Sequence, residues 1–464
     1  MKGVSVEQNK LGTASILSLL RQLAIPAVIA NVVNALYNIV DQIFIGQGIG
    51  YLGNAATNVA FPLTTLCLAL GLMLGLGAAA RFNLELGRGN NALAKKVMGN
   101  AFATLAVVGL FLCLLLQIFL GPLLTLFGAT ESIYDLALTY TSVSIWGVPF
   151  LLFSIGANPL VRADGSSTYS MVAIISGAVV NTLLDPLFIF SFGWGMAGAA
   201  WATVLGQSVS ALILALYLPR FKSVQIQRED FRLQGSLVRS FASLGMASFI
   251  FQSSNLLVQI VTNQSLRFYG ETSVYGSDIP IAVAGIVAKI NVIMISLIIG
   301  IVQGSQPILS FNYGAENWER VRETIRIAIV WVSVIGFGTW IAFEGFPYEF
   351  LSLFGSGSDA YFEFGIAYLR AFFLFSFVNG VQIFSATYFP AIGQAKMGAK
   401  ISLLKQLGLI LPFLLVMPRF FGVVGLAYAM PLADLIAFVV AGRALWNAYH
   451  RLGFPFEAKE GDMV

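Results

Sequence analysis

The chain alternates long apolar runs with short polar breaks along its whole length. Runs such as residues 102–120 and 327–343 carry no charge and are long enough to cross a bilayer as helices, which need about 20 residues each. Counting these runs predicts six spans before about Leu218 and six after about Ser236. A β-barrel would need short segments that alternate polar and apolar residues. We therefore predict an all-α polytopic membrane protein with twelve transmembrane helices.

Composition supports a membrane environment. Of the 464 residues, 58% are hydrophobic and only 10% are charged, and the mean hydropathy is +0.83. A soluble protein carries about a quarter charged residues, so most of this surface is expected to face lipid. The net charge of +4 comes from dispersed basic residues rather than a cluster, which indicates no nucleic-acid partner. Cys67 and Cys113 lie in apolar runs and are expected to be core residues.

The chain is divided by a polar stretch into two related halves. Residues 219–235 are rich in charge and are expected to link a first lobe, residues 1–218, to a second lobe, residues 236–464. Three glycines of the first lobe recur 227 residues later in similar contexts: Gly87 as Gly314, Gly128 as Gly355 in the repeated LxLFG, and Gly198 as Gly425. An even number of spans per half makes this a parallel repeat, with a cleft between the lobes.

The distribution of basic residues predicts the orientation. Most lysines and arginines fall in alternate loops or in the tails, including Arg81, Arg162, Arg320 and Lys396. The other set of loops is mostly acidic or uncharged. Because basic loops face the cytoplasm, both termini are predicted to be cytoplasmic, in a multi-pass protein of the cell (plasma) membrane.

Three acids lie well inside the predicted spans: Asp41, Asp185 and Asp434. A carboxylate at this depth costs about 2.5–3.5 kcal/mol on insertion scales, so such residues usually face a polar cavity and serve transport. The alternative is a neutral acid that only ties helices together. For Asp434 the sequence indicates no partner.

Two of these acids have polar neighbours at helical spacing, which predicts a cation site in the first lobe. Asn34 and Tyr37 share a face of the first helix with Asp41, and Asn181 shares a face of the fifth helix with Asp185. On the sixth helix, Thr203 and Gln207 share a face with each other. Such oxygen ligands suit a hard cation. A buried carboxylate can instead bind a proton, so the coupling ion stays open between Na⁺ and H⁺.

The second half lacks this set. The repeat carries Asp41 to Phe268 and Asp185 to Pro412, so the ion site is expected in the first lobe alone. Lys289, in the second span of the second half, either pairs with an acid or lines the cleft. No phosphate loop, histidine pair or nucleophile elbow occurs. We expect a transporter rather than an enzyme, with no cofactor.

Three segments resemble the multidrug and toxic compound extrusion family: LYNIVDQIFIGQ at residues 36–47, NTLLDPLFIF at 181–190 and GIVQGSQPILSFNYGAEN at 300–317. The resemblance implies a two-lobe antiporter that exports cationic or amphipathic compounds by alternating access, driven by inward Na⁺ or H⁺. It also implies roles for individual residues: Asp41, Asn181, Asp185 and Thr203 as the cation site, which would hold Na⁺ if sodium is coupled, and Asn34, Tyr37 and Asn158 as cavity positions. We add Gln207 and Lys289 to the expected substrate cavity.

Two other functions are alternatives to the export of drugs. A lipid-linked saccharide flippase of the same superfamily would need several arginines in the central cleft for its anionic substrates, and here the intramembrane acids outnumber such arginines. A non-transporting scaffold would not need buried carboxylates with oxygen partners on three helices. The expected partners are small organic cations or amphipathic drugs and the lipid bilayer, and the expected state is a monomer.

Overall fold

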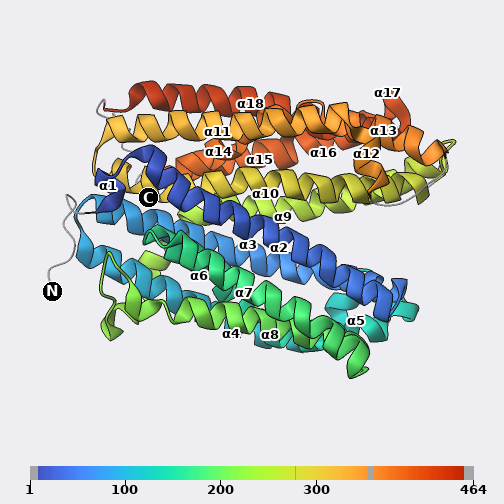
Figure 1. The fold of residues 1–464 in the computed structure, drawn as a ribbon, viewed down its shortest axis with the longest axis horizontal. Helices are drawn as coiled ribbons and strands as arrows, with labels where there is room; N and C mark the ends of the chain where they lie inside the picture. Colours follow the sequence, from blue (N-terminus) through green and yellow to red (C-terminus); the bar gives the residue numbers. More distant parts are fainter. Residues whose placement is uncertain (1–8, 277, 354–358, 454–464) are drawn as a thin grey trace.

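The computed structural model describes residues 9–276, 278–353 and 359–453, and these residues form helices, turns and loops without a strand. Figure 1 shows two helical bundles packed side by side, one from each half of the chain. We call them the N lobe (α1–α8) and the C lobe (α9–α18). The all-α prediction is confirmed.

The N lobe contains six crossings, one of which is broken between α5 and α6. Its helices are α1 (Lys10–Thr13), α2 (Ile16–Gly48), α3 (Tyr51–Gly87), α4 (Asn91–Leu126), α5 (Glu131–Ser144), α6 (Val148–Ala163), α7 (Ser167–Pro186) and α8 (Gly195–Ala215).

The C lobe repeats this plan with more interruptions. Its helices are α9 (Gly235–Glu271), α10 (Asp278–Gly314), α11 (Trp318–Gly345), α12 (Pro347–Ser352), α13 (Asp359–Phe373), α14 (Asn379–Ala391), α15 (Ala395–Leu403), α16 (Leu411–Val416), α17 (Pro418–Phe421) and α18 (Gly425–Arg451). Helices α3 and α10 begin and end 227 residues apart, as the sequence repeat predicts. Of the second LxLFG copy, Phe354 and Gly355 lie outside the described residues.

The described chain contains eleven helical stretches long and apolar enough to span a membrane. The last of them covers residues 395–451 and is 57 residues long. Gly422 has a φ of 61°, a left-handed conformation that suits glycine, and α18 then packs back against α16. This stretch therefore crosses twice, and the predicted total of twelve spans is confirmed for the described residues.

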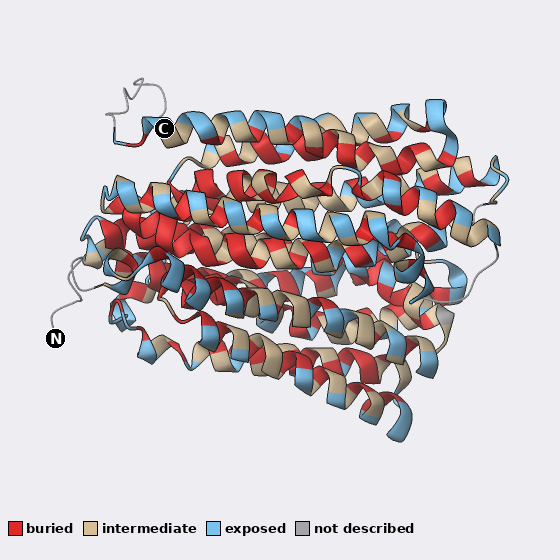
Figure 2. Cartoon of the chain, turned by 45° about the horizontal axis from the view of Figure 1, so that its top comes forward, coloured by how far each residue is buried: buried red, intermediate tan, exposed pale blue. Residues whose placement is uncertain are grey.

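The outer faces of the bundles are apolar and exposed. Figure 2 shows buried residues along the helix faces that meet inside the molecule and exposed residues on the outside. On α4, Leu114 is 62% exposed and Ile118 is 73% exposed. Apolar side chains at this exposure would be unfavourable in water but face lipid at no cost. The chain is a multi-pass membrane protein.

The segment between the lobes is held by two polar side chains of the N lobe. The Asn100 amide donates to the carbonyls of Asp230 and Arg232, both at 3.1 Å. The Asp164 carboxylate accepts three hydrogen bonds of 2.7–2.8 Å, from the Tyr217 hydroxyl and from the backbone N–H groups of Lys222 and Ser223. Burial raises the pKa of Asp164 above its ordinary value, although these hydrogen bonds oppose the shift.

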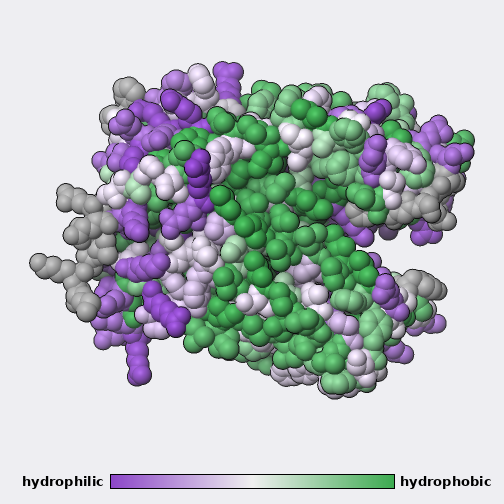
Figure 3. All heavy atoms as spheres, in the orientation of Figure 1, coloured by the Kyte–Doolittle hydropathy of each residue, from purple (hydrophilic) through white to green (hydrophobic). Residues whose placement is uncertain are grey.

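The two lobes pack closely only toward the end of the molecule that carries the chain termini. There a Cβ on Gly77 of α3 would overlap the Phe241 carbonyl of α9, and a Cβ on Gly245 of α9 would overlap the Met73 carbonyl of α3. Small residues permit this close approach of backbones. At the other end the surface is hollowed between the lobes (Figure 3). The lobes are therefore sealed at one end and separated at the other.

Candidate functional site

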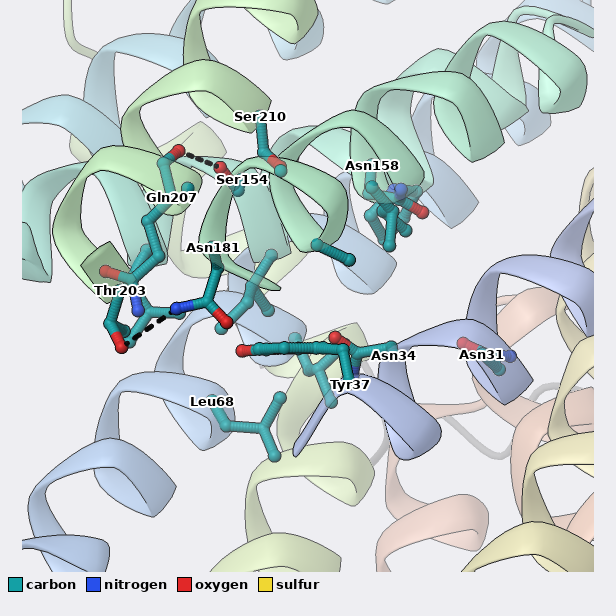
Figure 4. A pocket seen from close by; sticks show the side chains of 18 of the residues that line it. Asn31, Asn34, Tyr37, Leu68, Ser154, Asn158, Asn181, Thr203, Gln207 and Ser210 are labelled. Atoms are coloured by element: carbon teal, nitrogen blue, oxygen red, sulfur yellow. Dashed lines mark hydrogen bonds between the residues drawn. The ribbon is translucent and has the colours of Figure 1, made fainter. Parts of the chain in front are cut away.

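A polar cavity of about 180 Å³ lies inside the N lobe, between α2, α3, α6, α7 and α8. This volume can hold several water molecules. Its polar lining consists mainly of amides and hydroxyls (Figure 4): Asn31, Asn34, Tyr37, Ser154, Asn158, Asn181, Thr203, Gln207 and Ser210. Amide and hydroxyl groups of this kind offer hydrogen bonds without fixing one ligand shape, which suits varied organic compounds.

The structure brings together most of the residues that the sequence singled out. Helical spacing places each predicted pair or triplet on one face, and packing of α2 against α7, and of α7 against α8, turns those faces toward each other. Six of the predicted residues line the cavity: Asn34, Tyr37, Asn158, Asn181, Thr203 and Gln207. Lys289 does not. It is an exposed residue of α10 and lies apart from this cavity.

Asp41 and Asp185 form a pair beside the cavity. Their carboxyl groups lie within hydrogen-bonding reach of each other. Asp185 is fully buried and Asp41 is 9% exposed. Within the described chain, no basic side chain forms an ion pair with either acid, and Asp41 Oδ1 is buried without a hydrogen-bond partner. Two neighbouring carboxyl groups repel each other when both are charged, and a proton or a cation between them removes this repulsion.

Asn181 connects this acid pair to the cavity. Its amide lies 3.4 Å from Thr203 Oγ1 in the orientation drawn in Figure 4. Reversing the amide lets its nitrogen donate to Asp185 Oδ2 at 3.3 Å and its oxygen accept from the Thr203 backbone N–H at 3.2 Å. The reversed orientation satisfies both amide atoms and is the one we adopt. Asn181 thus links the carboxyl pair to α8.

The backbone near Asp185 is irregular. Helix α7 ends at Pro186, and residues Leu187–Ser191 form a π-helical turn. A proline removes one backbone donor, and π-helical turns are frequent at functional sites. The irregular turn therefore follows the acid pair directly.

Tyr140 of α5 is a member of this site that the sequence reasoning missed. Its hydroxyl lies near the Thr203 hydroxyl and close to Asp41. Tyr140 stands in a short helix with ordinary amphipathic spacing, so nothing in its own segment marks it. With it, the donor set around the acid pair contains two carboxylates, one amide and two hydroxyls.

This donor set fits a hard monovalent cation. The described residues contain no group of three or more His, Cys, Asp or Glu side chains that could hold a metal. A cation here would be held by Asp41, Asp185, Asn181 and Thr203, which supply the mixed oxygen ligands that such ions prefer. Asp41 Oδ1, buried without a partner, is available to it.

The expected loop position of Arg162 is wrong. Arg162 is in the last turn of α6, is only 4% exposed and lines the cavity. Its guanidinium donates a hydrogen bond to Asn158 Oδ1. The basic-residue count placed it in a cytoplasmic loop because only Ala163 separates it from the α6–α7 turn. The cavity therefore has a cationic end near Asn158, on the opposite side of Figure 4 from Thr203.

The cavity also touches the boundary between the lobes. Asn31 of α2 donates to Gln303 of α10 at 3.2 Å, and both side chains line the cavity. Gln303 continues with Gln306 into a narrow space toward the end that carries the termini. A polar contact between lobes therefore closes the cavity on that side.

Asp434, for which the sequence indicated no partner, forms a buried ion pair. Lys405 Nζ lies 2.7 Å from Asp434 Oδ1, inside the C lobe. Sequence reasoning missed Lys405, because this lysine follows Lys396 and Lys400 and belongs to the same basic end of a span.

Comparisons with known proteins give a consistent result. The sequence model of the MatE family matches residues 26–187 and 250–416. The multidrug export protein MepA of Staphylococcus aureus (strain MSSA476) is 23% identical over 419 residues, which are 90% of this chain and 91% of that protein.

Solved structures match over nearly the whole chain. The structure of the MATE multidrug transporter DinF-BH, solved as a complex, is 33% identical, with a TM-score of 0.88 over 97% of this chain and 99% of that chain. An outward-facing conformation of a multidrug resistance MATE family transporter of the MOP superfamily has a TM-score of 0.89 at 23% identity, over 98% of this chain and 99% of that chain.

Proposed function

This chain belongs to the MatE family of multidrug efflux transporters, and from that premise we propose that it is a secondary active antiporter. It exports cationic or amphipathic organic compounds in exchange for Na⁺ or H⁺, and both termini are cytoplasmic. The observation that carries the proposal is the buried Asp41–Asp185 pair, which has no basic partner among the described residues and lies beside a polar cavity. Such a pair needs an exchangeable cation.

The coupling ion and the organic compound act on the same residues. A cation that enters from outside binds Asp41, Asp185, Asn181 and Thr203 and neutralises the carboxyl pair. Neutralisation removes the negative field that holds an organic cation in the adjoining cavity. Asn181, which donates to Asp185 and lines the cavity, contributes to both sites. Occupation by one ligand therefore weakens the binding of the other, and this reciprocal effect is the thermodynamic basis of exchange.

Alternating access follows from the packing of the lobes. With cytoplasmic termini, the sealed end at Gly77 and Gly245 faces the cytoplasm and the hollow between the lobes faces outside. Opening toward the cytoplasm breaks the Asn31–Gln303 contact and separates the glycine faces. The cation then leaves inward and a new organic compound enters.

A flippase is not proposed, because the cavity has a single arginine. Anionic lipid-linked saccharides would need several basic side chains, and Arg162 is the one arginine that lines the cavity among the described residues. The amide-rich lining instead suits compounds of varied shape.

The direct test is ethidium efflux from energised cells that express the wild type, Asp41→Asn or Asp185→Asn. The exposed Asp135→Asn variant of α5 is the matched control. We expect wild type and control to extrude dye at equal rates and both pair variants to lose at least tenfold in rate while reaching the membrane in equal amounts. Normal efflux by both pair variants would refute the proposal.

A further inference from the structure

The C lobe contains a buried polar network centred on a lysine. Lys405 lies in the π-helical segment Leu404–Ile410 and is 7% exposed. Its Nζ is 2.7 Å from Asp434 Oδ1, 3.1 Å from Asn379 Oδ1 and 3.0 Å from Gln382 Oε1. Asn379 and Gln382 come from one face of α14, and Asp434 comes from α18. Two helices thus direct three oxygens at one ammonium group.

The ammonium group makes two hydrogen bonds, to Asn379 and Gln382, and one ion-pair contact with Asp434. An ammonium has three donors and no acceptor, and here it meets three oxygens. Breaking a buried pair by removing one partner is strongly destabilising, because the other charge is left uncompensated. Lys405 is therefore held as a charged group, and Asp434 is neutralised by the protein itself.

The position of this network in the repeat connects it with the N-lobe cavity. The α6–α7 and α14–α15 turns correspond at an offset of 228 residues, shown by Gly165 and Gly393, both with positive φ. The last span of each lobe corresponds at 227, shown by Gly198 and Gly425. At these offsets Asn379, Gln382, Lys405 and Asp434 correspond to Leu151, Ser154, Gly177 and Gln207, all of which line the N-lobe cavity. The network occupies the C-lobe counterpart of that cavity.

The two lobes therefore differ in what balances the negative charge of their buried acids. In the N lobe an acid pair beside an open cavity has no protein cation among the described residues. In the C lobe the Lys405 side chain fills the corresponding space, and its ammonium takes the place of a bound ion. We propose that Lys405 is a tethered cation that occupies a latent monovalent-cation site formed by Asp434, Asn379 and Gln382. It confines ion exchange to the N lobe.

This inference rests on the proposed function for its meaning in transport but makes its own prediction about binding. Truncation of Lys405 leaves one carboxylate and two amide oxygens around the space that Nζ occupied. These are the ligand types of the N-lobe site, and they suit a hard cation or, at the carboxylate, a proton. In the truncated variant, an ion from solution should then occupy the place of the missing Lys405 ammonium.

The test compares cation binding by purified wild type, Lys405→Ala and Lys405→Ala/Asp434→Asn, with Lys405→Arg as the charge-conserving control. Bound ²²Na⁺ is measured at constant pH, and bound protons are measured by potentiometric titration without Na⁺. We expect Lys405→Ala to bind about one more cation per chain than wild type, and both the double variant and the arginine control to bind none beyond wild type. The measurement that detects the extra cation, ²²Na⁺ binding or proton titration, identifies the ion.

Several results would overturn the proposal. One is an equal cation count in Lys405→Ala and the double variant. Another is a lower cation count in Asp434→Asn alone, which would mean that Asp434 already exchanges an ion in the native chain. Failure of the double variant to fold would show that Lys405 is needed for packing rather than for its charge. If Lys405→Ala fails to fold but the double variant folds, Asp434 requires a cation, as proposed.

The same variants separate this inference from the proposed function. Ethidium efflux by the double variant should stay within about twofold of wild type, because the N-lobe site is intact. If the N lobe binds no coupling ion at all, wild type and Asp41→Asn bind equally few cations, yet Lys405→Ala still gains an Asp434-dependent one. The two ideas therefore fail independently.

Discussion

The glycine contact between the lobes gives a quantitative prediction about the conformational equilibrium. Gly77 and Gly245 each lie against a backbone carbonyl of the other lobe, those of Phe241 and Met73. An alanine at Gly77 would force α3 and α9 apart, and overpacking of this kind costs typically 1–3 kcal/mol. This cost arises only in the conformation in which the lobes are in contact at these glycines. The substitution should therefore shift the equilibrium by about 5–150-fold toward the conformation that is open at the termini end.

The control for this substitution is Gly338→Ala. Gly338 is an exposed helical glycine of α11, and a Cβ there would meet nothing within 4 Å. Both substitutions gain the same helix propensity, about 1 kcal/mol, so their difference isolates the contact between the lobes. A variant with Gly245→Ala should behave like Gly77→Ala, because the two glycines face the same interface.

The assay is a distance distribution between two spin labels, one on each lobe at the termini end. Exposed Lys96 and Lys400 accept the labels as cysteines, in a background where the buried Cys67 and Cys113 are replaced by alanine. We expect a longer distance to gain population in Gly77→Ala and not in the control. Identical distributions in the two variants would refute the idea that this contact seals the termini end.

Three further substitutions test the site and its surroundings. Tyr140→Phe removes the hydroxyl near Thr203, a polar contact worth about 1 kcal/mol, and should raise the coupling-cation Kd about fivefold, whereas Tyr134→Phe should not. Equal Kd values for the two variants would exclude Tyr140 from the site. Arg162→Met removes a positive charge that repels the cationic dye, by about 1–2 kcal/mol for charges near 10 Å apart at an effective dielectric of 20. The ethidium Kd should therefore fall about tenfold. An unchanged Kd would show that Arg162 does not repel the bound dye. Burial raises the pKa of Asp164, so its protonated form stabilises the fold below about pH 4, and this stabilisation is lost as pH rises through the raised pKa. As pH rises through that window, the Tm of Asp164→Asn should fall less than the Tm of wild type. Parallel Tm curves would contradict a raised pKa at Asp164.

The sequence predicted the fold and the N-lobe cavity well because both depend on local spacing. Apolar run length determines which segments can span a bilayer, and helical periodicity alone places Asn34 and Tyr37 on the face of Asp41. The same rule places Asn181 on the face of Asp185, and Thr203 on the face of Gln207. Each of these inferences needs only residues of one helix.

The features that were missed depend on contacts between helices. Lys405 and Asp434 are on different spans, and nothing in either span indicates the other, so the ion pair emerges only from packing. Tyr140 reaches Thr203 from α5 in the same way. Arg162 was misplaced because a basic residue at a span end is usually exposed, and here the last turn of α6 is buried. Lys289 was misplaced in the opposite direction: it was expected to line the cavity, but it is exposed and lies outside the cavity.

The most direct test of the central claim is the reciprocal effect of the coupling ion on substrate binding. Ethidium Kd is measured in lipid nanodiscs by fluorescence anisotropy over a series of Na⁺ concentrations at fixed pH, and over a pH series without Na⁺. We expect wild-type Kd to rise at least fivefold with one of the two cations, and Asp41→Asn and Asp185→Asn to show no such rise. A wild-type Kd that is independent of both cations, or variants that keep the full dependence, would contradict coupling at the Asp41–Asp185 pair.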